Sequence, residues 1–385
     1  RTKSVCYSSG DHAFCNGCRP SSLIVFTTEN LFMNNTALPS SICQNAITDA
    51  SAWEPQDLQP DQTWSVSLTA EQVNDLLSGL NRVKDLHIAE INPANFPIPV
   101  CQDVIKQIAN ELRVGRGFAL LHGFPVEGIE NEDIARMYWG LCSHLGNGVT
   151  QGGDSYNGLI DYVTAGKLRP QTGKRTVGKS GHVGFHNDPA DTFMLLCVRQ
   201  APDLPKSQLV SSSTIHNVLR ERMPDKLHRL YEGFPHHHQD LQFAHEAPTS
   251  VAPIPVFSQA NDLVSSQYNT LRIKLAANLA GGLSAEDTEL LDLVDKIAAE
   301  FCFSFEFRAG DIQFGNNYVV WHGREAHQPA AQEDRTRLLM RIWLNIDDFR
   351  PFADEALVRY GALKYGERGR SAHDVLKSLD HRIDS

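Results

Sequence analysis

Two short segments, far apart in the chain, limit its fold more than any other feature. The first reads Gly184-Phe185-His186-Asn187-Asp188, and the second reads Trp321-His322-Gly323-Arg324. On a β-strand alternate side chains share a face, so an extended first segment points His186 and Asp188 the same way. A histidine that returns on a distant strand would complete a triangle of two imidazoles and one carboxylate. The sequence therefore predicts that these two segments meet.

Such a triangle predicts a metal site. Two imidazoles and one carboxylate on one side of an ion leave the opposite positions open, as is typical of non-haem Fe(II) oxygenases. Two histidines compete to close the triangle: His322 ends a strand-like run from Tyr318, whereas His327 falls farther along in an expected loop. We favour His322, and without the upstream pair both would be read as surface histidines.

The segment 337–346 reads as one long strand with two unlike faces. Its even-numbered positions from 338 to 344 are all apolar, whereas the odd-numbered ones include Arg337, Arg341 and Trp343. A guanidinium held in a pocket needs an anion opposite it, and an arginine fork matches a carboxylate with two hydrogen bonds. A dicarboxylic acid reaching from the metal to Arg337 would supply that anion. The alternative is that both arginines pair with acidic residues on an edge strand.

Charge and cysteine usage narrow the class of protein. The formal net charge of -11 argues against a phosphate-binding surface, so nucleic acid is not an expected partner. No run approaches the roughly 20 apolar residues of a membrane helix, so no membrane partner is expected. Single cysteines in apolar surroundings and the lack of a visible signal peptide favour a cytoplasmic protein. The oligomeric state stays open, with a homodimer as one option.

The segment 1–60 differs from the rest of the chain, because it holds four of the eight cysteines and few charges. Cys15 and Cys18 form a C-x-x-C motif, and Cys6, His12 and Cys43 offer further ligands for a structural zinc ion. A loosely ordered extension with free or disulfide-paired cysteines is the alternative.

The remaining chain alternates helical and strand-like patterns. Amphipathic segments predict helices at 69–80, 100–112, 131–145, 213–231 and 284–301. Short strands are expected at 118–121, 192–198, 303–308, 312–314 and 318–321. A run of short strands separated by polar turns is expected within 252–275. The Gly-rich stretch 146–181 reads as a binding loop, and His236-His237-His238 as a solvated loop.

These patterns predict a mainly β fold with flanking helices (α+β) around a jelly-roll core. The core would occupy 61–350, after the extension 1–60. A helical tail at 351–385 would pack on its outside.

From Leu112 to Phe349 the chain resembles the taurine dioxygenase-like family of Fe(II)- and 2-oxoglutarate-dependent oxygenases, which includes clavaminate synthase and γ-butyrobetaine hydroxylase. The segments that carry the resemblance are Gly117-Phe118 through Gly123-Phe124-Pro125, Phe185-His186-Asn187-Asp188, Asn316-Asn317 with His322-Gly323-Arg324, and Arg337 to Arg341 before Trp343.

The resemblance implies a double-stranded β-helix and a set of roles. His186, Asp188 and His322 would bind iron, Arg337 would hold the distal carboxylate of 2-oxoglutarate, and Arg341 would grip an anionic group of the substrate, with Trp343 nearby. The hydroxyl that often helps to bind 2-oxoglutarate in the family has no exact match in this chain. Ser207 or Gln208 would take its place.

The implied activity uses Fe(II), 2-oxoglutarate and O2 and releases succinate and CO2. We expect oxidation of an unactivated C–H bond in a small carboxylate or amino acid, by hydroxylation, desaturation or ring closure. A zinc-dependent hydrolase with the same three ligands is a rival interpretation, although it has no use for Arg337. A non-catalytic jelly-roll protein that binds a metal is another.

Overall fold

A computed structural model gives the positions of most of the chain. The described residues are 42–59, 62–149, 151, 159–164, 178–239, 247–250, 252–328, 332, 335–351 and 353. All of them belong to one compact unit, Pro39–Ser385. Cys6, Cys15 and Cys18 and the predicted C-terminal helix lie outside the described residues.

Two β-sheets form the centre of this unit. The larger has the order β1-β2-β11-β6-β13-β3, with β4 also paired to β13. Its strands are β1 (Ser65–Ser67), β2 (Phe118–His122), β3 (Asn147–Gly148), β4 (Ile160–Val163), β6 (Thr192–Arg199), β11 (Ile312–Asn316) and β13 (Leu338–Asn345). Apart from β1 and β2, which are parallel, the paired strands are antiparallel.

The smaller sheet has the order β10-β7-β12-β5, and its pairs are antiparallel. Its strands are β5 (Val183–His186), β7 (Ser207–Ser211), β10 (Phe303–Phe305) and β12 (Val320–Arg324). A separate hairpin joins β8 (Phe257–Ala260) to β9 (Leu263–Ser266).

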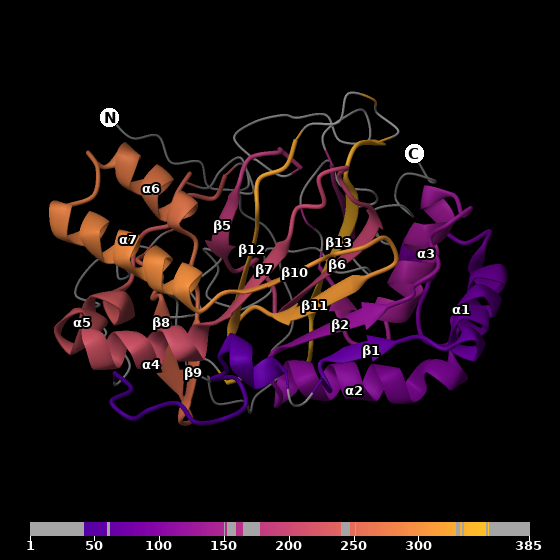
Figure 1. Ribbon diagram of the computed structural model, residues 1–385, viewed down its shortest axis with the longest axis horizontal. Helices are drawn as coiled ribbons and strands as arrows, with labels where there is room; N and C mark the ends of the chain where they lie inside the picture. Colours follow the sequence, from indigo (N-terminus) through magenta and orange to yellow (C-terminus); the bar gives the residue numbers. More distant parts are fainter. Residues whose placement is uncertain are drawn as a thin grey trace, which may run out of the picture. The chain divides into compact units, whose positions relative to one another are not determined.

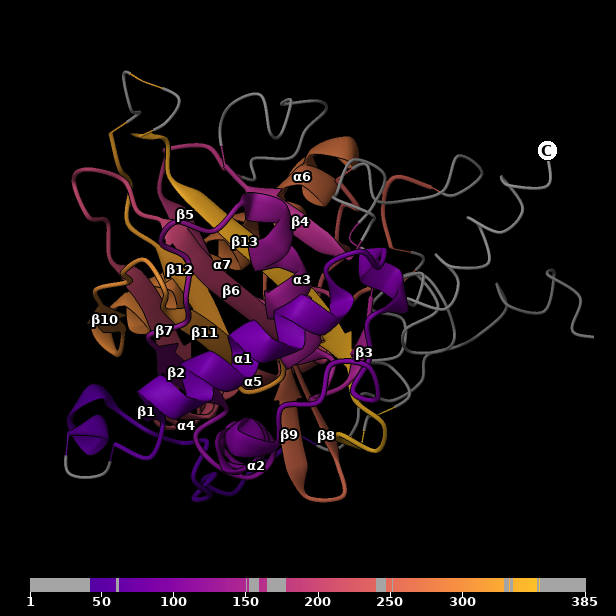
Figure 2. The ribbon, with the colours of Figure 1, turned by 90° about the vertical axis from the view of Figure 1, so that its right-hand side faces the viewer.

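Helices cover the outer faces of both sheets (Figures 1 and 2). Beside the larger sheet lie α1 (Ala70–Val83), α2 (Gln102–Arg113) and α3 (Asn131–Cys142). Beside the smaller sheet lie α4 (Ser212–Arg222), α5 (Pro224–Glu232), α6 (Thr270–Leu279) and α7 (Ala285–Glu300). Within the described residues, no helix has the length and apolar character needed to cross a membrane.

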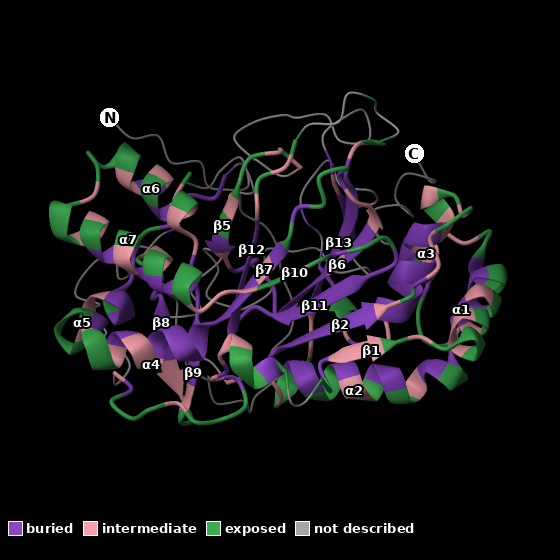
Figure 3. Cartoon of the chain, in the orientation of Figure 1, coloured by how far each residue is buried: buried purple, intermediate pink, exposed green. Residues whose placement is uncertain are grey.

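The two faces of β13 confirm the predicted alternation. Met340, Ile342 and Leu344 are fully buried in the main hydrophobic cluster, on the side of the sheet that α3 covers. Figure 3 shows the interior strands β2, β6, β11 and β13 as buried, whereas the edge strands β1 and β10 are partly exposed. The other face of β13 carries Arg341 and Trp343 toward the smaller sheet, so the apolar side anchors the strand and the polar side is left for the site.

The arrangement is the predicted jelly-roll, or double-stranded β-helix. Leu209 and Val320 of the smaller sheet are fully buried in the same cluster as Phe193 of the larger one. Apolar residues between two facing sheets hold the sheets together. The strands of the two sheets are therefore fixed relative to one another, and the site described below takes residues from both sheets.

Some element boundaries differ from the predicted ones. The helix expected at 213–231 is two helices, because Pro224 starts α5 and leaves Met223 as the break. The strands expected throughout 252–275 stop at Ser266, and α6 begins at Thr270. Within the expected loop 146–181, the short strands β3 and β4 pair with β13.

The prediction for His236-His237-His238 was wrong, because all three side chains are buried. Backbone hydrogen bonds fix the segment: the His237 N–H donates to the carbonyl of Arg272, and the His238 N–H donates to that of Pro248. Polar composition predicted solvent exposure, but tertiary contacts enclose the segment. Among the described residues, one cluster of His, Cys, Asp or Glu side chains is placed to hold a metal ion, and it does not include these histidines.

The described part of the predicted extension, 42–59, belongs to the compact unit and packs in its hydrophobic clusters. Trp53 and Leu58 lie in the main hydrophobic cluster. Cys43 is buried in the second cluster, and its thiol lies 3.4 Å from the carbonyl oxygen of Asn45. The zinc site and the boundaries of the three predicted parts of the chain stay predictions.

One buried histidine predicts how stability depends on pH. His216 is fully buried, and its Nε2 lies 3.0 Å from the Tyr231 hydroxyl. Burial, followed by the charge of Arg220, lowers the pKa of His216 to about 4. Between about pH 4 and 6.5 the unfolded chain therefore binds the extra proton, so the folded state loses stability as the pH falls through this window.

We expect His216 to lower the free energy of unfolding by on the order of 3 kcal/mol across this window, since each pKa unit corresponds to about 1.4 kcal/mol. Urea unfolding of the wild type and of His216→Gln at several pH values measures it. The variant should show a shallower pH dependence. Equal slopes for the two proteins would contradict the assigned cause.

Candidate metal centre

The pairing of β5 with β12 brings the two predicted histidine ligands together. His186 and His322 are direct cross-strand partners in this antiparallel pair. Their ring centroids are 4.2 Å apart, and the His322 ring also packs on Phe193 at 3.9 Å. His322 lies within β12 and does not end it. The register between two strands thus sets the distance between the imidazoles.

Asp188 lies just past the end of β5, so it is not a strand residue as the sequence analysis assumed. Hydrogen bonds to distant residues hold the turn. The Asn187 N–H donates to the carbonyl of Tyr268, and the Asp188 N–H donates to Asn317 Oδ1, both at 2.9 Å. These bonds direct the carboxylate back toward the histidines.

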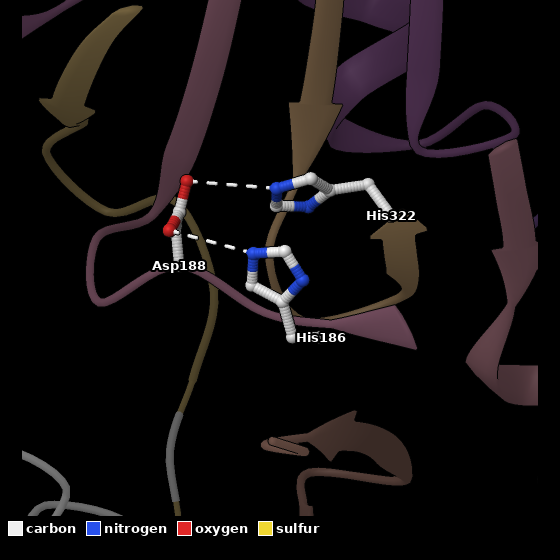
Figure 4. Close-up of side chains that lie close together, drawn as sticks. All are labelled: His186, Asp188 and His322. Atoms are coloured by element: carbon white, nitrogen blue, oxygen red, sulfur yellow. Dashed lines mark ion pairs between the residues drawn. The ribbon is translucent and has the colours of Figure 1, made fainter. Parts of the chain in front are cut away.

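The three side chains converge (Figure 4). Asp188 Oδ1 lies 4.0 Å from His186 Nε2, and Asp188 Oδ2 lies 3.6 Å from His322 Nε2. One ligand atom from each residue lies within 4.8 Å of the other two. These separations suit three groups around a single ion.

The donor set fits Fe(II), because two imidazoles and one carboxylate form the facial triad of non-haem iron sites. His186 Nδ1 lies 2.9 Å from the carbonyl of Gly184, so its Nε2 is the nitrogen left for a metal. Asp188 and His322 are buried, and only His186 is partly exposed. A metal ion would therefore be enclosed on the protein side.

Burial keeps the imidazoles neutral, as metal ligands must be. It lowers the pKa of His186, and with the neighbouring His186 it lowers that of His322 well below the ordinary value. Burial alone would raise the pKa of the Asp188 carboxyl. Arg341, followed by the two histidines, more than offsets this effect and lowers that pKa. All three groups are thus in the protonation state that binds a cation.

Arg341 and Trp343 were predicted to contact substrate, and the structure places both against Asp188. Arg341 Nη1 donates to the two carboxylate oxygens at 3.2 and 3.3 Å, and Trp343 Nε1 donates to Oδ2 at 3.0 Å. The guanidinium also lies 4.6 Å from the centre of the Trp343 ring. In this structure both side chains hold the carboxylate of the metal centre.

The guanidinium of Arg337 uses only one of its three nitrogens in a hydrogen bond to a described residue. It is buried, and Nε donates to Gln200 Oε1 at 2.7 Å. Within the described part of the chain, its two Nη groups have no acceptor. Burial, followed by repulsion from Arg324, lowers the pKa of Arg337 to about 10, which an incoming anion would reverse. β13 is an interior strand and not the edge strand of the alternative prediction, although Arg341 does pair with acidic residues, as that alternative expected.

The side chains of Ser207 and Gln208 lie on opposite faces of β7. Ser207 pairs across the sheet with Arg324 and shares its face with the interior residue Leu209. The Gln208 side chain points to the other face, where its Nε2 lies 3.5 Å from Ser304 Oγ. Of the two predicted residues, Ser207 is the one on the face of the site.

Four residues near the centre escaped the sequence analysis as contributors. Asn317 orients Asp188, and Arg324 ties the end of β12 to the carbonyls of Lys179 and Gly181 at 2.8 Å. Asp161 and Gln151 both bind Arg341. One signal was available: Asp161 is the only charged residue in the apolar run 159–163.

Comparison with known proteins supports the same interpretation. A family model described as taurine catabolism dioxygenase TauD, TfdA family matches residues 82–343. "FR-33289 synthase" of Streptomyces rubellomurinus (strain ATCC 31215) is 25% identical over 324 residues, which cover 81% of this chain and 94% of the relative. "Taurine hydroxylase-like protein SAT17" of Stachybotrys chartarum (strain CBS 109288 / IBT 7711) is 26% identical over 315 residues, which cover 78% and 80%.

A solved structure shares the fold. Asparagine oxygenase, in complex with Fe(II), 2S,3S-3-hydroxyasparagine and succinate, superposes with a TM-score of 0.56 at 16% identity, over 74% of this chain and 94% of that one. The family model covers more than half of the chain and includes all three converging ligands. The chain therefore belongs to the TauD, TfdA family and is a 2-oxoglutarate-dependent non-haem iron dioxygenase.

Proposed function

We propose that this enzyme oxidises an unactivated C–H bond of a small carboxylate or amino acid. The observation that carries the proposal is the pairing of two features on one buried face: the triangle of His186, Asp188 and His322, and the guanidinium of Arg337 with donors that no described residue accepts. A metal ligand set alone would serve many reactions. An added anion site fits a cosubstrate with a free carboxylate.

The residues divide the work as follows. His186, Asp188 and His322 would hold Fe(II), and Arg337 would bind the distal carboxylate of 2-oxoglutarate, with Ser207 on the same face. The iron, with 2-oxoglutarate and O2, supplies the chemistry that breaks a C–H bond and releases succinate and CO2. The chain itself fixes the ligands, keeps the imidazoles unprotonated and keeps water away from the buried face.

The substrate class rests on the relatives. The asparagine oxygenase complex contains a hydroxylated amino acid, and one curated relative is called taurine hydroxylase-like. Both names point to small charged molecules that carry an amino group. We propose a substrate of this kind, and the outcome would be hydroxylation, desaturation or ring closure.

The role of Arg341 in substrate binding stays a prediction, and the structure gives that residue partners of its own. A zinc hydrolase or a non-catalytic metal protein would release no succinate. Succinate formation that requires Fe(II), O2 and 2-oxoglutarate, measured with a panel of amino acids and short acids, separates these alternatives. Mass spectrometry of the product then identifies the reaction.

The two candidate histidines give a first prediction. His322→Ala should lose bound iron, because it removes one of three ligands at the buried centre. His327→Ala should keep it, because His327 lies beyond β12 and its Nδ1 lies 3.0 Å from the carbonyl of Gln328. Iron content after anaerobic loading with Fe(II) and desalting measures both. Equal loss in the two variants would contradict the assignment.

A second prediction concerns Arg337. Arg337→Ala should raise the KM for 2-oxoglutarate by about 10- to 100-fold, because a hydrogen bond to a charged group contributes about 1.5 to 3 kcal/mol. Arg335→Ala is the matched control, since that side chain is exposed on the same segment. Succinate release at varied 2-oxoglutarate measures the effect. An unchanged KM in Arg337→Ala would rule out this anion site.

A further inference from the structure

A buried chain of charges runs from the metal centre into the larger sheet. Arg341 is the middle member. Its Nη1 donates to both oxygens of Asp188, and its Nη2 donates to Asp161 Oδ2 at 3.1 Å. Asp161 is 1% exposed, and Arg341 is its direct cross-strand partner in the pairing of β4 with β13. One guanidinium is therefore shared between a metal ligand and a second carboxylate.

Gln151 fixes the guanidinium from a third side. Its Oε1 accepts from Arg341 Nε at 2.7 Å, and its Nε2 donates to the backbone carbonyl of Arg341, also at 2.7 Å. The same Nε2 donates to the carbonyl of Leu159 at 3.1 Å, two residues before Asp161. The orientation of Arg341 is thus set by residues that do not belong to the metal centre.

Asp161 is not a metal ligand, because the guanidinium of Arg341 stands between it and Asp188. A buried carboxylate is costly unless it is paired, so Asp161 needs the arginine. The metal centre in turn needs Asp161 as a second partner for Arg341. An arginine with Asp188 as its only anionic partner would bring its whole charge to a carboxylate that must also bind a cation.

We propose that Asp161 is a positioning residue for the metal centre: it binds the second Nη group of Arg341, shares the charge of that guanidinium, and so leaves more of the Asp188 charge to a divalent metal. Partners of this kind, one step removed from the ligands, orient a ligand and tune its basicity. The inference rests on the proposed function only in that the three ligands must bind a divalent ion. It does not depend on the substrate.

The test is a metal titration of the metal-free protein. Mn(II) is the probe, because the electron paramagnetic resonance signal of the free ion reports binding directly without turnover. Asp161→Asn keeps the shape of the side chain and removes its charge. We expect its dissociation constant for Mn(II) to rise by about 10-fold or more, the range that such outer partners contribute.

Asp311→Asn is the matched control. Asp311 is also buried, but its hydrogen-bond partners, His122 Nδ1 at 2.7 Å and the Arg308 N–H at 2.8 Å, are not residues of the metal centre. Thermal unfolding of the metal-free variants shows how far each one is destabilised. Asp161→Asn should weaken Mn(II) binding while Asp311→Asn leaves it near the wild-type value.

A double variant separates action through Arg341 from a general loss of negative charge. If Asp161 acts through the arginine, Asp161→Asn with Arg341→Gln should bind Mn(II) more tightly than Asp161→Asn alone. Wild-type affinity in Asp161→Asn, an equal loss in Asp311→Asn, or a double variant no tighter than the single one would each overturn the proposal. A wild type that binds no Mn(II) would overturn the metal centre and the proposed function with it.

Discussion

The register between β5 and β12 is the constraint on which the rest of the site depends. It sets His186 directly opposite His322, so two imidazoles from distant parts of the chain meet, and the pairing becomes irregular only after His322. A slip by one residue would turn one histidine to the other face of the sheet. The apolar contacts between the two sheets, such as those of Leu209 and Val320, hold that register.

The strand pairing sets the positions of the ligands, whereas burial and neighbouring charges set their protonation states. Burial keeps His186 and His322 neutral, whereas the neighbouring Arg341 lowers the pKa of Asp188 against the effect of burial and keeps its carboxylate ionised. The two arginines on one face of β13 differ in their hydrogen-bond partners. Arg341 has carboxylate partners in the chain, whereas Arg337 has donors that no described residue fills. We therefore propose Arg337 as the residue that binds an external anion.

Local patterns predicted the features that depend on local geometry. The two faces of β13 followed from strand periodicity. The predicted convergence of His186 and Asp188 with His322 is also present, although hydrogen bonds past the end of β5, and not strand alternation, direct Asp188. Contacts across distant strands were not predictable in this way. Asp161 meets Arg341 only because β4 pairs with β13, and the predicted solvated loop at 236–238 is buried because other segments enclose it.

The central claim is that one iron ion binds among three named atoms. Anomalous diffraction at the iron edge, from crystals grown anaerobically with Fe(II), tests it most directly. We expect one strong peak within bonding distance of His186 Nε2, His322 Nε2 and an oxygen of Asp188. A peak elsewhere, or one that any of these three residues does not approach, would contradict it.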